Sequence, residues 1–127
     1  MTAPIPTNVH YHRKARELEL GYADGQSYRL AIEYLRVFSP SAEVRGHGRG
    51  QETLQTGKQF VGLKDITPAG RYALKLHFDD GHDSGLFSWD YLWWLINHRE
   101  ANWADYLQRL EAAGASREPL GIEIKQL

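Results

Sequence analysis

Hydrophobic and polar positions alternate in two neighbouring segments near the start of the chain. Residues 16–22 alternate leucine and tyrosine with charged side chains, and residues 28–32 resume the alternation after an Asp24-Gly25 pair. A period of two is typical of half-buried strands, and Asp-Gly between two such runs favours a tight turn. We therefore predict a β-hairpin over residues 16–32.

Helical spacing follows directly, because Ile32, Leu35 and Phe38 recur every three residues before the chain meets Ser39-Pro40. A residue that precedes proline is biased away from helix, so a short helix should end there. Residues 42–56 are rich in glycine and polar side chains and are interpreted as a long irregular loop. Alternation returns at residues 60–66 and 71–78, which predicts two strands joined by a turn at residues 67–70.

The last third of the chain is predicted to be helical. A short strand at residues 86–87 should lead into a helix capped by Ser88 and ending near His98. Asn102 is predicted to cap a second helix, with Trp103, Tyr106, Leu107 and Leu110 on its buried face and Gly114 after its last turn. Of the four tryptophans, Trp89, Trp93, Trp94 and Trp103, most should be core residues, and an exposed one would mark an interface.

These elements indicate an α+β fold: a small antiparallel sheet with an N-terminal hairpin, helices packed against it, and two C-terminal helices. We expect one domain over residues 13–117, preceded by a loose tail at residues 1–12, in which Pro4 and Pro6 oppose regular structure, and followed by a peripheral tail at residues 118–127.

Composition removes several classes of function. The 127 residues carry a formal charge of −1, so neither nucleic acid nor an anionic membrane is an expected partner. No cysteine is present, which excludes disulfides, thiolate metal sites and cysteine nucleophiles. No apolar run approaches the length of a membrane span, so a cytoplasmic location is the expectation.

Two polar segments carry the candidate chemistry. In the turn after residue 78, His82 lies between Asp80 and Asp83, where it is either a metal ligand or a surface histidine fixed by a neighbouring carboxylate. Residues 45–50 alternate glycine with Arg45, His47 and a second arginine, which suits anion binding or simply a flexible loop. This segment lacks the Lys-Ser/Thr ending of a P-loop, so nucleotide hydrolysis is not supported.

A family resemblance connects the two segments. Leu35-Arg36-Val37-Phe38-Ser39-Pro40-Ser41-Ala42-Glu43-Val44-Arg45-Gly46-His47-Gly48, followed by Gly57-Lys58, Phe78-Asp79-Asp80-Gly81-His82-Asp83-Ser84-Gly85 and Ser88-Trp89-Asp90-Tyr91-Leu92, resembles the small DUF971 family. This family is also described as the gamma-butyrobetaine hydroxylase-like N-terminal domain. The resemblance extends from about Leu18 to Arg117.

The resemblance implies a zinc site that this chain has lost. In the hydroxylases, the domain precedes a separate 2-oxoglutarate/Fe(II) oxygenase domain and binds a structural zinc through three cysteines and a histidine. Motif alignment places those cysteines at Ser39, Ser41 and Val44, and the histidine at His82. A tetrahedral thiolate site cannot form from these residues. The oxygenase domain is also absent, so hydroxylase activity is not expected.

Relatives in which the domain is fused to P-loop ATPases that act as iron–sulfur scaffolds imply an accessory role. Our leading hypothesis is a non-enzymatic recognition module without a cofactor, whose surface combines residues 39–50 with residues 79–84. The proposed binding residues are Arg36, Ser39, Ser41, Arg45, His47, Asp79, Asp80 and His82. Arg36 or Arg45 should pair with Asp79, Asp80 or Glu43 where the relatives have metal bonds. The expected partner is a protein, such as an iron–sulfur scaffold ATPase.

Two alternatives remain at this point. The protein could bind iron or zinc through His82 and His47 together with Asp80 or Asp83. It could also be a small enzyme in which His82 and Asp80 form an acid–base pair, although no substrate pocket is evident in the sequence.

Overall fold

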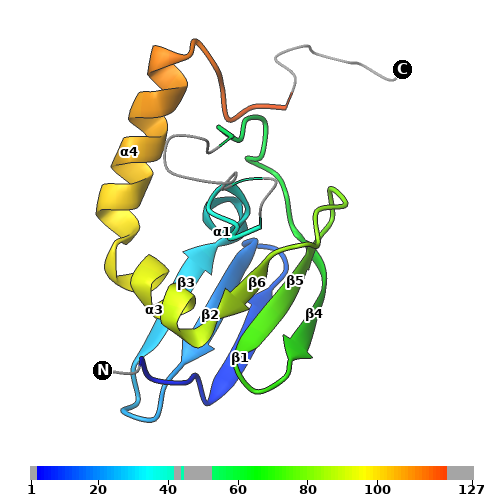
Figure 1. Cartoon of the computed structure of the whole chain (residues 1–127), viewed down its shortest axis with the longest axis vertical. Helices are drawn as coiled ribbons and strands as arrows, with labels where there is room; N and C mark the ends of the chain where they lie inside the picture. Colours follow the sequence, from blue (N-terminus) through cyan, green and yellow to red (C-terminus); the bar gives the residue numbers. More distant parts are fainter. Residues whose placement is uncertain (1–2, 42–43, 45–52, 120–127) are drawn as a thin grey trace.

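The computed structural model describes residues 3–41, 44 and 53–119 (Figure 1). Its described elements follow the order β1, β2, β3, α1, β4, β5, β6, α3 and α4. The strands form two three-stranded antiparallel sheets, and the helices pack against them. This architecture confirms the predicted α+β class, with the strands divided between two sheets rather than gathered in one.

The first sheet contains β1 (Asn8–His12), β2 (Glu17–Gly21) and β3 (Ser27–Ala31), in that spatial order. The β2–β3 hairpin confirms the prediction from alternation. Strand β1 corrects the expectation of a loose tail through residue 12. Its Val9 and Tyr11 lie opposite Leu20 and Leu18 of β2, so its stability comes from cross-strand pairing that the local sequence does not reveal.

The second sheet contains β4 (Leu63–Ala69), β5 (Ala73–Phe78) and β6 (Leu86–Ser88). The strand predicted at residues 60–66 instead starts at Leu63 and runs through Pro68, where a turn was expected. Proline is tolerated there because β4 is an edge strand, whose outer side needs no amide donor. The turn comes later, at Gly70 with φ +57, and leaves Tyr72 outside the strand and 59% exposed.

Three described helices pack against the two sheets. They are α1 (Ile32–Val37), α3 (Trp89–Asn97) and α4 (Arg99–Ala112). The predicted cap of α3 is confirmed, because the Tyr91 amide donates to the Ser88 hydroxyl at 3.1 Å. Helix α4 ends as predicted, with Gly114 at φ +63 after the C-cap residue.

The start of α4 differs from the prediction. Only His98 separates α3 from α4, so the chain is already helical before it reaches Asn102. The Asn102 amide group is used elsewhere, donating to the Tyr34 hydroxyl at 3.0 Å. The buried face of α4 is also narrower than expected: Tyr106 and Leu110 are buried, whereas Leu107 is 40% exposed.

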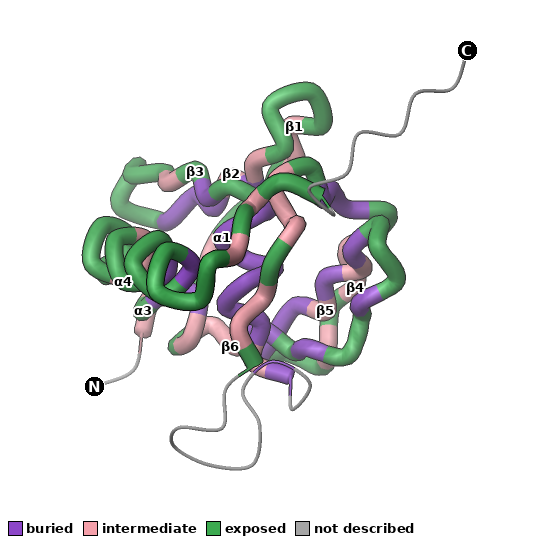
Figure 2. The backbone as a smooth tube through the Cα atoms, turned by 90° about the horizontal axis from the view of Figure 1, so that it is seen from above, coloured by how far each residue is buried: buried purple, intermediate pink, exposed green. Residues whose placement is uncertain are grey.

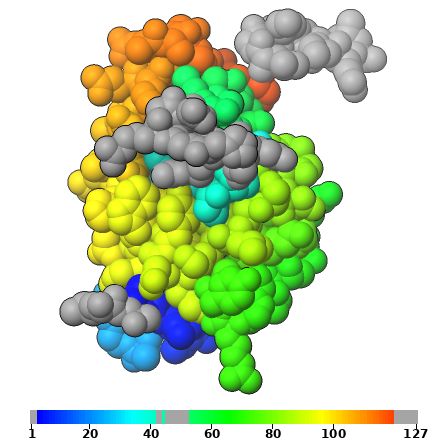
Figure 3. Space-filling model, viewed as in Figure 1, coloured from blue at the N-terminus to red at the C-terminus, as the bar shows by residue number. Residues whose placement is uncertain are grey.

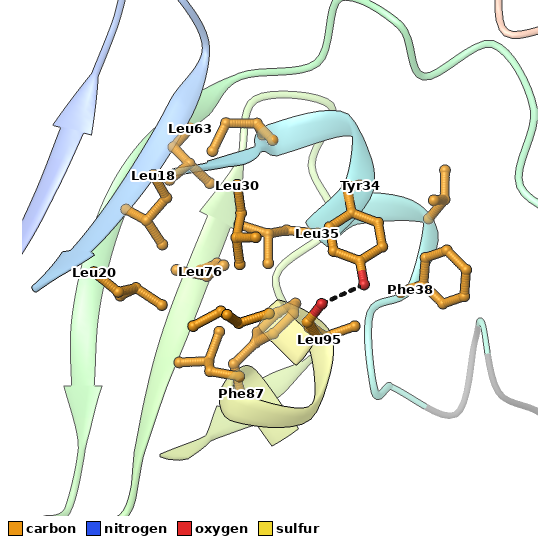
Figure 4. Close-up of a cluster of buried hydrophobic side chains, with 14 of the residues drawn as sticks. Leu18, Leu20, Leu30, Tyr34, Leu35, Phe38, Leu63, Leu76, Phe87 and Leu95 are labelled. Atoms are coloured by element: carbon orange, nitrogen blue, oxygen red, sulfur yellow. Dashed lines mark hydrogen bonds between the residues drawn. The ribbon is translucent and has the colours of Figure 1, made fainter. Parts of the chain in front are cut away.

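The core lies where the two sheets meet α1 and α3. Figure 4 shows leucines and aromatic residues from both sheets and from the two helices converging, and the labelled ones are Leu18, Leu20, Leu30, Tyr34, Leu35, Phe38, Leu63, Leu76, Phe87 and Leu95. Figure 2 shows buried segments at the centre and a largely exposed α4. In the view of Figure 3, α3 and α4 (yellow to orange) cover one side of the molecule and the green strands the other.

Among the described helices, none is long and apolar enough to cross a membrane.

The chain that follows α4 packs back against the rest of the domain. The Gly57 and Gln59 amides donate to the carbonyls of Ser116 and Arg117, at 3.0 and 3.1 Å. The Arg117 guanidinium binds both carboxylate oxygens of Glu33 on α1, at 2.7 and 2.8 Å. Residues 120–127 of the tail that was expected to be peripheral lie outside the described part.

Candidate functional site

Two segments that are far apart in the sequence meet at one buried imidazole. The segment that follows α1 supplies Ser39 and Ser41, and the turn between β5 and β6 supplies His82. His82 Nε2 lies 2.9 Å from the Ser39 hydroxyl and 3.2 Å from the Ser41 hydroxyl. All three residues are buried, with at most 6% of their surface exposed. We call these three residues the Ser-His cluster.

The β5–β6 turn is built to point His82 inward. The Phe78 amide donates to the His82 carbonyl at 3.0 Å, and the Gly81 amide donates to the Phe78 carbonyl at 3.2 Å. Gly81 has φ +91, a conformation that L side chains rarely adopt. The local reason for this turn is therefore the glycine that directly precedes the histidine.

A second glycine allows the two segments to approach. A Cβ atom at Gly85 would lie 2.3 Å from the Ser39 hydroxyl and 3.2 Å from Pro40 Cδ. A side chain at this position would have to displace the buried Ser39 hydroxyl and crowd the Pro40 ring. Gly85 is thus required by the contact between the β5–β6 turn and the Ser39-Pro40 corner.

Asp80 joins the turn to a set of charged residues around the cluster. Its Oδ2 atom accepts from Arg36 Nε at 2.9 Å and from Lys58 Nζ at 3.2 Å, and its Oδ1 accepts from the His82 amide at 3.2 Å. Arg36 also donates to the Gln55 side chain at 3.0 Å. Burial alone would raise the pKa of Asp80, but the His82 amide and the two cations outweigh it, so the pKa lies below its usual value.

The fourth position implied by the resemblance is close to the cluster along the chain. The Val44 amide donates to the Ser41 carbonyl at 3.1 Å, and the Val44 side chain is buried, with 4% exposed. Two hydroxyls, a valine and one imidazole do not match the donor set that zinc requires. Within the described ranges, no group of three or more His, Cys, Asp or Glu side chains could hold a metal ion.

The other predicted site residues fall into two groups. Arg45, Glu43 and His47 lie outside the described residues, so their predicted roles stay predictions. Asp79 is exposed beside Gly62, and its amide donates to the Gly62 carbonyl at 2.9 Å. Of the ion pairs proposed between the two segments, the structure contains Arg36–Asp80.

The sequence did not single out Lys58 or Gln55 as contacts of this site. Gly57-Lys58 belongs to the motif that carried the resemblance, which was the available signal for Lys58. Gln55 had no comparable signal, because it lies in a segment with neither periodicity nor a recognisable motif.

The side chains of His82 and Asp80 are not arranged as the predicted acid–base pair would require. Asp80 contacts the backbone amide of His82, while its other oxygen is neutralised by Arg36 and Lys58. Three cavities formed by described residues are lined by side chains other than His82 and Asp80. Trp94, in contrast, is 39% exposed and stacks on the Tyr91 and His98 rings, at 5.8 and 4.9 Å between centroids.

Comparison with known proteins supports the relationship inferred from the motifs. The model of the family described as gamma-butyrobetaine hydroxylase-like, N-terminal, matches residues 9–93. The chain belongs to this family. The match includes both segments of the Ser-His cluster and ends within α3.

Solved structures agree over more of the chain. Two proteins with solution NMR structures are 51% and 46% identical to it, with TM-scores of 0.81 and 0.79 and 99% of both chains covered in each case. A DUF971-family protein of unknown function from Acidithiobacillus ferrooxidans is 37% identical, with a TM-score of 0.61, and the alignment covers 72% of this chain and 92% of that one. None of the curated proteins matches.

Proposed function

We propose that this family member is a non-enzymatic recognition module whose contact surface is the turn at residues 79–84, held in place by the Ser-His cluster. The observation that carries the proposal is the enclosure of His82. Its Nε2 atom lies within hydrogen-bond distance of two buried serine hydroxyls. These contacts fix the turn at residues 79–84 and keep the imidazole away from the surface.

The turn offers a charged surface for a partner. Asp79 and Asp83 are exposed, and the Asp83 side chain retains 59% of its accessible surface, with its Oδ2 atom 3.9 Å from His77 Nδ1. Because Asp80 is already bound to Arg36 and Lys58, these two carboxylates are the ones available to an external cation. Exposed charges on a fixed loop can orient a partner of opposite charge and increase the rate at which the two proteins associate. Both effects suit a recognition module.

The partner class comes from the family resemblance. Relatives fused to iron–sulfur scaffold ATPases favour a partner of that kind, which would place the module in a pathway of iron–sulfur or metalloenzyme assembly. In such a complex this chain contributes surface contacts, and the partner holds the cluster.

The test measures binding of the purified chain to the P-loop scaffold ATPase of the same organism, without and with its cluster, by isothermal titration calorimetry. We expect the Asp79→Asn/Asp83→Asn double variant to bind at least ~10-fold more weakly, as loss of two interface charges implies. The matched control, Asp105→Asn/Glu111→Gln, removes two exposed charges from α4 and should leave the affinity unchanged.

Absence of binding to either form of the ATPase would contradict the proposed partner, and equal losses for both double variants would contradict the proposed surface. Titration of untagged protein with Zn(II) and Fe(II) tests the metal-binding alternative. Stoichiometric binding at micromolar metal, abolished by His82→Ala or His47→Ala, would replace recognition by the turn with metal binding as the function.

A further inference from the structure

An open sheet edge lies on a different part of the molecule from the turn at residues 79–84. Strand β3 is the last strand of the first sheet, and it lies beside α4 in both Figure 1 and Figure 2. Within the sheet it pairs with β2 alone. Its outer side could therefore accept another strand.

The hydrogen-bond register shows which groups face that edge. The Tyr22 amide donates to the Gln26 carbonyl at 2.9 Å, at the turn end of the hairpin. At the other end, the Ile32 amide donates to the Arg16 carbonyl, also at 2.9 Å. Because bonded and non-bonded pairs alternate in an antiparallel ladder, every second residue of β3 faces β2 and the others face outward. Ser27, Arg29 and Ala31 are the outward residues.

The outward backbone groups of β3 are available to form hydrogen bonds with an added strand. No described residue forms a hydrogen bond with the outward amides of Arg29 and Ala31. Both residues are exposed, as is Ser27 at the start of the strand. A short strand presents a few donors and acceptors here, enough for an added strand of similar length.

A cavity of about 230 Å³ lies directly beside this edge, between β3 and α4. Its lining is mainly apolar and consists of Arg29, Leu30, Ala31, Tyr34, Arg99 and Trp103. A second depression of about 440 Å³ continues past Arg99 along Tyr28 and the α3–α4 corner. The two depressions form a groove along β3 that can accept the side chains of an added strand.

The charged side chains that line the groove are Arg29, Arg99 and Glu100. The Arg99 guanidinium lies over the Tyr28 ring at 5.6 Å, and among the described residues no carboxylate pairs with it. The Arg29 side chain is 46% exposed and binds Glu17 at 3.0 Å. An acidic side chain of an incoming segment would find a cation at Arg99.

We propose that this groove binds an extended segment of a partner protein, which adds as a strand to β3, places one apolar side chain in the cavity and pairs a carboxylate with Arg99. This mode combines main-chain bonds for affinity with a pocket and a charge for specificity. A second copy of this chain is a poorer occupant, because antiparallel pairing of two β3 strands would bring their own arginines together.

The test uses a fluorescein-labelled peptide of alternating valine and glutamate, with a valine–lysine peptide as the charge control. Fluorescence anisotropy gives the affinities, and amide NMR spectra of the chain locate the contact. We expect the acidic peptide to bind at least ~10-fold more tightly than the basic one, with the largest shifts at β3 and Trp103, as steering by Arg99 requires.

Two variants make the test specific. Ala31 already has φ −61, so Ala31→Pro fits the backbone and removes one outward amide donor. Arg99→Glu reverses the proposed anchoring charge, and Arg71→Glu reverses an exposed charge elsewhere as the matched control. We expect binding to weaken at least ~5-fold in the first two variants and to stay unchanged in the third.

Several outcomes would overturn the proposal. They are shifts that map away from β3, equal affinity for the two peptides, no binding of the acidic peptide at millimolar concentration, and self-association through β3 instead of peptide binding. If Ala31→Pro fails to fold, Arg99→Glu decides alone. None of these variants alters the turn at residues 79–84. Binding to the scaffold ATPase therefore tests the proposed function separately from peptide binding at β3.

Discussion

Asp80 shows how one side chain can connect a turn, a helix and a loop. It accepts hydrogen bonds from Arg36, Lys58 and the His82 amide, and Arg36 itself has a side-chain exposure of 8%. Burial opposes the charged form, but the three donors lower the pKa of Asp80 below its usual value. A lowered folded-state pKa means that the ionised carboxylate stabilises the fold above the unfolded pKa and that this contribution disappears as pH falls.

We expect Asp80→Asn to reduce the free energy of unfolding by about 1–3 kcal/mol at neutral pH, because Arg36 loses its charged partner while staying buried. The difference from the parent chain should shrink as the pH falls through the lowered folded-state pKa of Asp80, because the carboxylate then becomes neutral itself. Urea unfolding at several pH values measures this. Asp105→Asn, an exposed residue in an i, i+4 pair, is the control. A pH-independent difference would show that Asp80 acts by shape alone.

Tyrosine hydroxyls join several elements of this protein. Tyr34 of α1 donates to the Leu95 carbonyl of α3 at 2.7 Å and accepts from Asn102 of α4 at 3.0 Å. Tyr22, at the end of β2, is buried to the same extent but its hydroxyl has no hydrogen-bond partner in the described structure. Its ring packs edge-on against Trp93 at 5.1 Å.

These two tyrosines predict opposite results for the same substitution. Tyr34→Phe should lower the free energy of unfolding by about 1–3 kcal/mol, because a buried carbonyl and an amide lose their partner. Tyr22→Phe removes an unpaired buried hydroxyl, so it should be neutral or stabilise the fold by up to about 1 kcal/mol. Chemical denaturation of both variants beside Tyr72→Phe, an exposed control, measures the contrast. Equal losses at Tyr22 and Tyr34 would refute this assignment of the bonds.

The sequence predicted the elements that are determined by neighbouring residues in the chain. The β2–β3 hairpin follows from alternation around Asp24-Gly25, and α3 follows from Ser88 before an apolar stripe. Strand β1 could not be predicted in this way, because Val9 and Tyr11 become strand residues through pairing with β2. Asn102 had the local pattern of a cap, but a buried hydroxyl across the core determined its role.

The candidate site depended even less on local pattern. No spacing rule brings Ser39 to His82, which are separated by 43 positions, and their proximity was expected only through the family resemblance. The Arg36–Asp80 pair was one of several charge pairings considered. Lys58 was missed as the second cation because the Gly57-Lys58 motif marks the residue but does not indicate which carboxylate it binds.

At the scale of the whole molecule, the Ser-His cluster connects the two sheets. Ser39 and Ser41 follow α1, which continues directly from β3 of the first sheet, whereas His82 lies between β5 and β6 of the second. Two buried hydrogen bonds thus act at the position where the resemblance implies zinc in cysteine-containing relatives. Three of the four positions that the resemblance implies therefore meet directly, and the fourth, Val44, is joined to Ser41 by a backbone hydrogen bond.

We therefore expect the variant Ser39→Cys/Ser41→Cys/Val44→Cys to bind one zinc ion through three thiolates and His82. Zinc bound to the folded chain should raise Tm, and a chelator should reverse the increase, because binding to the folded state alone adds to stability. X-ray absorption would report three sulfur ligands and one nitrogen ligand, and calorimetry the change in Tm.

His82→Ala in the same background supplies the decisive control, since it removes the one ligand that the parent chain retains. Its zinc affinity should fall by at least ~10-fold, while the parent chain should show no change in Tm with zinc or chelator. A cysteine variant that binds no more zinc than the parent chain would mean that the β5–β6 turn and the end of α1 are held in a geometry specific to the serine hydrogen bonds. In that case the protein would have diverged from a metal site in its backbone as well as in its side chains.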